Sequence, residues 1–360
     1  MIMKTYVIRR LLLIAPTVFG ILLVNFIIIQ FTPGGPVERV IARHTFESGI
    51  RSYDNADSFD YDDGSKGARI GADSLNSALV RDLEVQFGFD KPAYARFFKM
   101  TLDYLRFDFG KSYYRNERVL NIIIEKLPVS LSLTFWSAAI MYMLAIPLGV
   151  YKAVRDGCRF DVWSSVILNI FCAVPGFILA VLLIVLFAGG SYFNVFPIRG
   201  LVSVNWHEFN LWNRIIDYLW HITLPVICMA LSGFAVLTLL AKNSFMDELG
   251  KLYVMTARSK GLTERAVLLR HIFRNAMLII ISGFPLTCLS MLFTGSMLIE
   301  VIFSLDGIGL LGFQSVSGRD YPVVFATLYI YTLMGLMLKL ISDIIITMVD
   351  PRINFDTVNI

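Results

Sequence analysis

The chain has 360 residues, of which 56% are hydrophobic and 17% are charged, and its mean hydropathy is +0.65. Soluble domains carry about a quarter charged residues, so these values point toward a membrane protein. The apolar residues come in long runs separated by polar stretches, which excludes a soluble enzyme, a disordered chain and a disulfide-stabilised scaffold. The formal net charge of +4 is too small a surplus to indicate a nucleic-acid partner.

Six apolar segments are long enough to cross a membrane. A helix needs about 20 apolar residues to span the hydrocarbon core of a bilayer. The segments are Leu11–Phe31, Leu131–Tyr151, Val162–Ala188, Leu219–Ala241, Met277–Ile299 and Val323–Val349. The sequence therefore predicts an all-α polytopic membrane protein with six transmembrane helices. Five segments contain an internal proline, which either kinks a helix beside a pathway or reflects the general enrichment of proline in membrane helices.

The placement of lysine and arginine predicts that both termini lie in the cytoplasm. Three basic residues precede the first segment, three follow the second, and seven lie between the fourth and the fifth. The short loops on the opposite side contain only Arg199, Arg214 and Arg319. The long connection 32–128, with 14 basic and 15 acidic residues, is then external and does not affect the assignment.

These assignments divide the chain into four parts. They are an N-terminal segment with the first helix (1–31), a periplasmic loop domain (32–128), a transmembrane domain of five helices (129–350) and a cytoplasmic tail (351–360). Within the loop domain, residues 51–74 are rich in Asp, Gly and Ser, which indicates a mobile insertion. Residues 79–114 combine helical spacing with aromatic side chains, and we expect them to form a small, partly helical subdomain.

No pattern in the chain supports a cofactor site, a metal site or a catalytic site. Gly307–Gly312 matches G-x-G-x-x-G, but a dinucleotide site requires a preceding strand, and this segment follows a membrane span. Gly110-Lys111-Ser112 lacks the upstream glycine of a phosphate-binding loop. The four cysteines form no C-x-x-C pair and the four histidines are scattered. We therefore expect a chain that is not an enzyme and binds neither cofactor nor metal.

Lys339 and Asp343 are ionisable residues inside the sixth segment, spaced by one helical turn. A charge within the bilayer costs at least about 2.5 kcal/mol, so each side chain needs a partner. They line a translocation pathway in one interpretation. In the other, they form an ion pair with each other and have a purely structural role.

Residues 242–276, between the fourth and fifth segments, are too polar to enter the bilayer. They carry seven basic and three acidic residues, and their apolar residues recur at helical spacing on both sides of Gly261. This pattern predicts two short helices joined by a glycine. Such an element is typical of an interfacial amphipathic helix or of a docking surface for a soluble partner.

Two stretches of this loop resemble the coupling loop of the permease subunits of binding-protein-dependent ABC importers. Tyr253–Gly261 reads Y-V-M-T-A-R-S-K-G, similar to the T-A-R-x-K-G variant of the peptide branch, and Leu268–Ala276 extends the similarity. In that family the short helix sits in a groove of a cytoplasmic ATPase, and the glycine permits a tight bend. The resemblance implies an ATPase-coupling site made by Tyr253, Thr256, Ala257, Lys260, Gly261, Arg270 and Asn275.

Shorter landmarks extend the resemblance over nearly the whole chain. They are Pro33–Val37, Phe87–Pro92, Asp108–Ser112, His221–Pro225, Glu300–Phe303 and Asp350–Ile353. One departure is Asp306, which stands where proline is common in the family. The resemblance implies the type I ABC importer fold and a place in the inner membrane of a Gram-negative bacterium.

The resemblance also implies what the chain does and with which partners. We expect ATP-driven import of peptides, including microcin C-like peptides, from periplasm to cytoplasm. The expected partners are a second homologous permease, cytoplasmic ABC ATPase subunits that bind ATP and Mg²⁺, a periplasmic peptide-binding protein, the peptide and the lipid bilayer. The competing function classes are an ion-gradient-driven secondary transporter or channel, and a purely structural membrane subunit. The absence of a visible internal inverted repeat argues against a secondary transporter.

Overall fold

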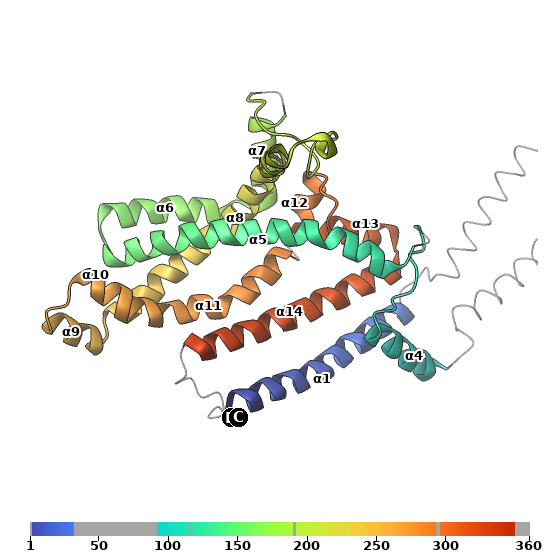
Figure 1. The fold of residues 1–360 in the computed structure, drawn as a ribbon, viewed down its shortest axis with the longest axis horizontal. Helices are drawn as coiled ribbons and strands as arrows, with labels where there is room; N and C mark the ends of the chain where they lie inside the picture. Colours follow the sequence, from blue (N-terminus) through green and yellow to red (C-terminus); the bar gives the residue numbers. More distant parts are fainter. Residues whose placement is uncertain (1, 32–91, 116, 190–191, 293–295, 350–360) are drawn as a thin grey trace, which may run out of the picture. The chain divides into compact units, whose positions relative to one another are not determined.

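The computed structural model of the chain describes residues 2–31, 92–115, 117–189, 192–292 and 296–349 (Figure 1). Within these ranges the regular structure is helical, apart from one isolated β-bridge between Lys111 and Arg118. This confirms the predicted all-α fold class. The proposed insertion 51–74, the first part of 79–114 and the tail 351–360 lie outside the described residues. The chain forms two compact units, one of Pro16–Leu120 and one of Met1–Ala15 with Asn121–Ile360, which are described separately.

The unit Pro16–Leu120 contains most of helix α1 (Ile2–Phe31) and all of helix α4 (Ala93–Leu105). Aromatic rings join the two helices, because Phe97 of α4 packs edge-on against Phe19 and Phe26 of α1, with ring centroids 5.4 and 5.3 Å apart. Tyr104 packs in the same way against Phe109. The described part of the predicted subdomain 79–114 is therefore partly helical and is packed through aromatic side chains.

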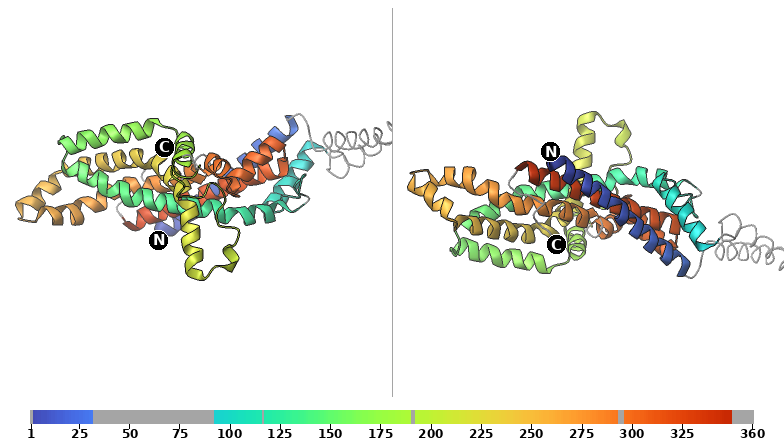
Figure 2. Two further views of the ribbon diagram at one scale, coloured as in Figure 1. Left: turned by 90° about the horizontal axis from the view of Figure 1, so that it is seen from above. Right: turned by 90° about the horizontal axis from the view of Figure 1, so that it is seen from below.

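The second unit is a bundle of helices. Its helices are α5 (Val119–Val154), α6 (Arg159–Ala173), α7 (Gly176–Phe187), α8 (Leu211–Leu249), α9 (Leu252–Ser259), α10 (Glu264–Val267), the π-helix η3 (Leu268–Ile272), α11 (Phe273–Ser290), α12 (Ser296–Ile302), α13 (Ile308–Gly318) and α14 (Tyr321–Val349), with the short 3-10 helix η2 at Trp206–Glu208. Helices α9 and α10 lie at the same end of this unit as the turn between α5 and α6 (Figures 1 and 2). The start of α5 lies within the stretch assigned to the loop domain 32–128.

Helices occupy the described part of each of the six predicted membrane segments, with a break at Val174 and Pro175 in the third. Among the described residues, four stretches are each long and apolar enough to cross a membrane alone: α5, α8, Glu264–Ser290 and Tyr321–Ile345. Helices α6 and α7 meet this test as a pair bent by 95°. Pro175 is the N-cap of α7, so this predicted kink is a complete break in the third segment. The apolar stretch of α1, Leu12–Ile28, is shorter.

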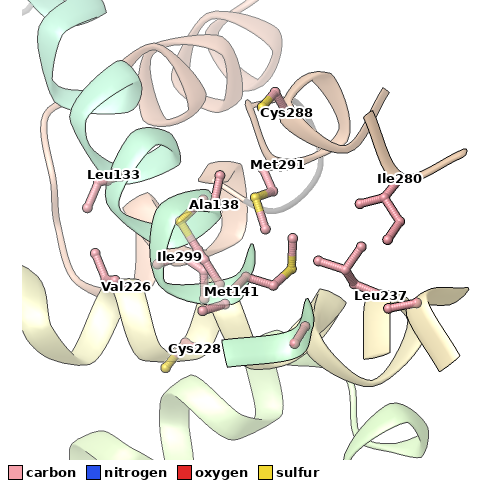
Figure 3. Close-up of a cluster of buried hydrophobic side chains, with 14 of the residues drawn as sticks. Leu133, Ala138, Met141, Val226, Cys228, Leu237, Ile280, Cys288, Met291 and Ile299 are labelled. Carbon is pink, nitrogen blue, oxygen red and sulfur yellow. The ribbon is translucent and has the colours of Figure 1, made fainter. Parts of the chain in front are cut away.

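A continuous apolar core joins α5, α8, α11 and α12 (Figure 3). Met141 of α5 and Met291, the C-cap residue of α11, point into the space between these helices (Figure 3), where both side chains are buried. Gly149 permits the closest approach of α5 to α8, since a Cβ there would lie 2.7 Å from the carbonyl oxygen of Thr238. Cys228 and Cys288 are buried in this core, whereas Cys158 is half-buried and Cys172 is exposed.

The G-x-G-x-x-G segment makes room for a side chain of the protein itself. Glu300 is completely buried, and its carboxylate accepts hydrogen bonds from the Ser130 hydroxyl (2.6 Å) and the Leu310 N–H (2.9 Å). The N–H of Ile308 donates in turn to Ser130 Oγ (2.8 Å). A Cβ at Gly307 would lie 2.5 Å from both Glu300 Cδ and Ser130 Oγ. Gly307 and Gly309 therefore permit close packing between α5, α12 and α13, whereas a Cβ at Gly312 would meet no atom within 4 Å.

Candidate coupling site

Helix α9 is a short helix bounded by two glycine turns. Helix α8 ends at Leu249, Gly250 caps it, and α9 begins two residues later. At the other end Gly261 has a φ of +80°, a conformation that residues with a Cβ rarely adopt. Thr263 then caps α10, its Oγ1 accepting a hydrogen bond from the Ala266 N–H. The structure thus confirms the predicted arrangement of two short helices separated by Gly261.

One side of α9 is fixed to the bundle by a polar network. The Tyr253 hydroxyl donates to Glu248 Oε2 (2.5 Å) and accepts from Asn275 Nδ2 (3.3 Å). Lys251 forms an ion pair with the same Glu248 carboxylate. Burial of the phenol and its hydrogen bond to the carboxylate both raise the pKa of Tyr253, which therefore remains a hydrogen-bond donor. The network connects α8, α9 and α11.

The turn at Gly261 is also closed by an ion pair. Arg258 and Glu264 face each other across it, with Arg258 Nε 3.0 Å from Glu264 Oε1. The second oxygen of Glu264 accepts from the Arg258 guanidinium at 3.0 Å. This bidentate geometry favours one shape of the turn, although an exposed pair contributes only about 0.2–1 kcal/mol.

The opposite side of α9 is exposed and mixes apolar and cationic groups. Leu252 is 80% exposed and Met255 is 59% exposed, which is unusual for large apolar side chains with no membrane-spanning role. Leu269, on η3, is exposed as well. Lys260 adds positive charge beside them, whereas the charge of Arg258 is paired with Glu264. This surface has the composition of a docking site for a soluble protein.

The residues predicted for this site divide into three groups in the structure. Thr256, Lys260, Gly261 and Arg270 are exposed. Tyr253 and Asn275 are half-buried and hydrogen-bonded to each other, whereas Ala257 lies on the buried side of α9. Sequence reasoning missed Glu248, the common partner of Tyr253 and Lys251. The opposite charges of Glu248 and Lys251, spaced i,i+3, were a signal that could have identified it.

Lys339 and Asp343 lie on α14, the former exposed and the latter half-buried. Among the ion pairs formed by described residues, none joins these two side chains. The mutual pair considered from the sequence is therefore not formed in this structure. A role in lining a pathway stays a prediction.

We expect that removing the Tyr253 hydroxyl destabilises the coupling loop. Tyr253→Phe leaves the largely buried Glu248 carboxylate without one donor and removes the hydrogen bond between Asn275 and the phenol oxygen, which we expect to cost about 1–3 kcal/mol. Thermal melting of the purified permease in detergent and hydrogen exchange across α9 measure the loss. Ser259→Ala removes an exposed hydroxyl from the same helix and is the control. Equal effects of the two variants would contradict a specific role for the Tyr253 network.

Comparison with known proteins identifies the family. The sequence profile described as "Binding-protein-dependent transport system inner membrane component" matches residues 145–355. The chain is 55% identical to the peptidoglycan transport system permease protein YejB of Agrobacterium fabrum, over 98% of this chain and 99% of the relative. It is 51% identical to the inner membrane ABC transporter permease protein YejB of Escherichia coli O157:H7, over 98% and 100% of the two chains.

More distant matches agree with this assignment. The oligopeptide transport system permease protein AppB of Bacillus subtilis is 30% identical, over 98% of this chain and 100% of the relative. An inward-facing structure of the MetNI methionine ABC transporter matches with a TM-score of 0.50 at 17% identity, covering 64% of this chain and 97% of the other, which shows a common fold. The chain belongs to the binding-protein-dependent transport system inner membrane components, a family of multi-pass ABC importer permeases.

Proposed function

We propose that this chain is the permease subunit of an ATP-driven importer that moves peptides from the periplasm to the cytoplasm. The observation that supports this proposal is the sequence similarity, over nearly the full length, to a permease named for peptidoglycan transport (55% identity) and to one named for oligopeptide transport (30% identity). Peptidoglycan and oligopeptides both contain peptide chains. The exposed apolar and cationic side of α9 supports a soluble ATPase as the partner on the cytoplasmic side.

The proposal assigns the rest of the cycle to other subunits. A second homologous permease completes the pathway, a periplasmic binding protein delivers the peptide, and separate ATPases hold ATP and Mg²⁺. Both termini and α9 face the cytoplasm, in agreement with the lysine and arginine distribution. Movement of the ATPases displaces α9, and the bundle changes between two packing arrangements. Lys339 and Asp343 are proposed to line the pathway.

A labelled-peptide uptake assay tests this function. A strain that lacks the gene for this chain is expected to lose uptake of a labelled oligopeptide and to regain it on complementation. In vesicles of the purified complex, uptake should require ATP and persist when ion gradients are dissipated. A second arm with a labelled peptidoglycan stem peptide, and a third with microcin C sensitivity, separate the substrate types. Uptake driven by an ion gradient without ATP would support the secondary-transporter alternative instead.

A further inference from the structure

Four charged side chains meet where α5, α6 and α8 come together, and we call them the Asp161 cluster: Lys152, Asp156, Asp161 and Lys242. One carboxylate oxygen of Asp161 lies 2.9 Å from Lys152 Nζ, and the other lies 2.7 Å from Lys242 Nζ. Lys242 Nζ also lies 2.8 Å from a carboxylate oxygen of Asp156. The Lys152 side chain is completely buried and that of Asp161 is 6% exposed, whereas that of Asp156 is 49% exposed. Two cations and two anions thus balance each other, with Asp161 at the centre.

Further hydrogen bonds hold this cluster in one geometry. Lys152 Nζ also donates to the carbonyl oxygen of Asp161 (2.8 Å) and to the hydroxyls of Ser164 (2.6 Å) and Ser165 (2.8 Å). The N–H of Gly157 donates to Asp161 Oδ2 (3.1 Å). Asp161 Oδ1 has only its ion pair with Lys152, and the other contacts of the pair are hydrogen bonds. A buried ion pair held by such hydrogen bonds favours one arrangement of the elements that carry it. The cluster therefore fixes the end of α5 and the start of α6 against α8.

Helix α8 carries this connection on to the coupling loop. It continues unbroken from Lys242 to Leu249, immediately before α9. Along this stretch the Ser244 hydroxyl donates to the carbonyl oxygen of Ala276 (2.7 Å), and the buried Phe245 packs against Phe273 with ring centroids 5.8 Å apart. These contacts join α8 to α11, whereas Glu248 joins α8 to α9 through Tyr253, so a displacement of α9 reaches α8 at Glu248 and then Lys242 along the same helix.

We propose that Asp161 is a positioning residue that makes α6 and the end of α5 follow α8 when the coupling loop moves. The Lys242–Asp161 contact passes the displacement from α8 to α6, and the Lys152–Asp161 contact passes it to α5. Because α7 follows α6 across a break of only two residues, the third membrane segment moves with them. This inference rests on the proposed function and names residues through which ATP hydrolysis is coupled to transport.

The test compares two asparagine substitutions in the complete importer reconstituted in lipid vesicles. The quantities measured are the ATPase retained per permease, the rate of ATP hydrolysis, and the number of ATP molecules consumed per labelled peptide imported. The importer that contains the Asp161→Asn permease is expected to keep its ATPase subunits and to hydrolyse ATP. The number of ATP molecules consumed per imported peptide is expected to rise about tenfold. Asp156→Asn removes a solvent-exposed partner of the same Lys242 and is expected to stay within about twofold of the wild type.

A double variant separates coupling from simple stabilisation. Asp161→Asn leaves the completely buried charge of Lys152 without its carboxylate partner, whereas Lys242 keeps Asp156, so the single variant is expected to melt earlier. Asp161→Asn combined with Lys152→Met removes that charge and should recover the melting temperature, while ATP consumed per peptide stays high. If the ratio returned to the wild-type value together with the melting temperature, Asp161 would have only a structural role. Equal ratios for Asp161→Asn and Asp156→Asn would also overturn the proposal.

The wild-type complex in the same vesicles provides a separate test of the proposed function. A wild type that hydrolyses ATP and imports no peptide contradicts the peptide-import function itself. A raised ratio confined to the two Asp161 variants supports the positioning role.

Discussion

Gly261→Val is expected to abolish peptide import while the permease still inserts and folds. Gly261 has a φ of +80°, and an L-residue with a Cβ in the left-handed region costs about 1–2 kcal/mol, or more when β-branched. That cost lowers the population of this turn conformation relative to others by a factor of about 5 to 30, and in the other conformations α9 has a different orientation. The measurements are the amount of ATPase that copurifies with the permease and the rate of labelled-peptide uptake.

Gly250 offers a matched control for Gly261. It precedes α9 instead of following it, its φ is −80°, and a Cβ there would meet no atom within 4 Å. Gly250→Val therefore adds the same side chain to the same loop without backbone strain, and we expect copurification and uptake near the wild-type values. If Gly261→Val imported peptide as well as Gly250→Val does, the positive φ would not matter for coupling.

Gly307→Ala is expected to destabilise the permease strongly. The added methyl group would lie 2.5 Å from Glu300 Cδ and Ser130 Oγ, and the carboxylate that would have to move is buried and hydrogen-bonded. Overpacking of this kind typically costs about 1–3 kcal/mol, and any movement of Glu300 breaks its hydrogen bond to Leu310 as well. A lower melting temperature in detergent and a lower yield of monodisperse protein measure the effect.

The same glycine pattern supplies the control for this experiment. Gly312 lies within α13, and a Cβ there would meet no atom within 4 Å. Gly312→Ala is expected to leave the melting temperature unchanged or to raise it, because alanine in a helix is about 0.5–1 kcal/mol more favourable than glycine. Similar losses in both variants would contradict the specific packing of Gly307 against Glu300.

The local features of the coupling loop were accessible to sequence reasoning. The apolar spacing on both sides of Gly261 predicted two short helices, and the structure contains α9 and α10 there. Gly261 itself has the positive φ that the bend requires. Periodicity and glycine preference act over a few residues, so they can be read without knowledge of the rest of the chain.

Partners that are distant in the sequence were not accessible in this way. Glu300 was part of a recognised landmark, but its partner Ser130 is 170 residues away. The sequence argued against a cofactor site at the G-x-G-x-x-G pattern but did not explain the glycines. The packing of Glu300 against Gly307 in the structure explains the first of them. Lys152 and Lys242 served only as indicators of the cytoplasmic side, whereas in the structure both bind Asp161.

The excess of apolar residues and its division into long segments determined a helical membrane protein, and the polar residues between the fourth and fifth segments indicated the candidate coupling loop. The tertiary structure alone decided that the third segment is bent by 95° between α6 and α7 and that α5, α6 and α8 are joined through buried charges. The physical reason is the range of the interactions. Helix formation and membrane insertion depend on neighbouring residues, whereas the burial of an ion pair depends on which helices pack together.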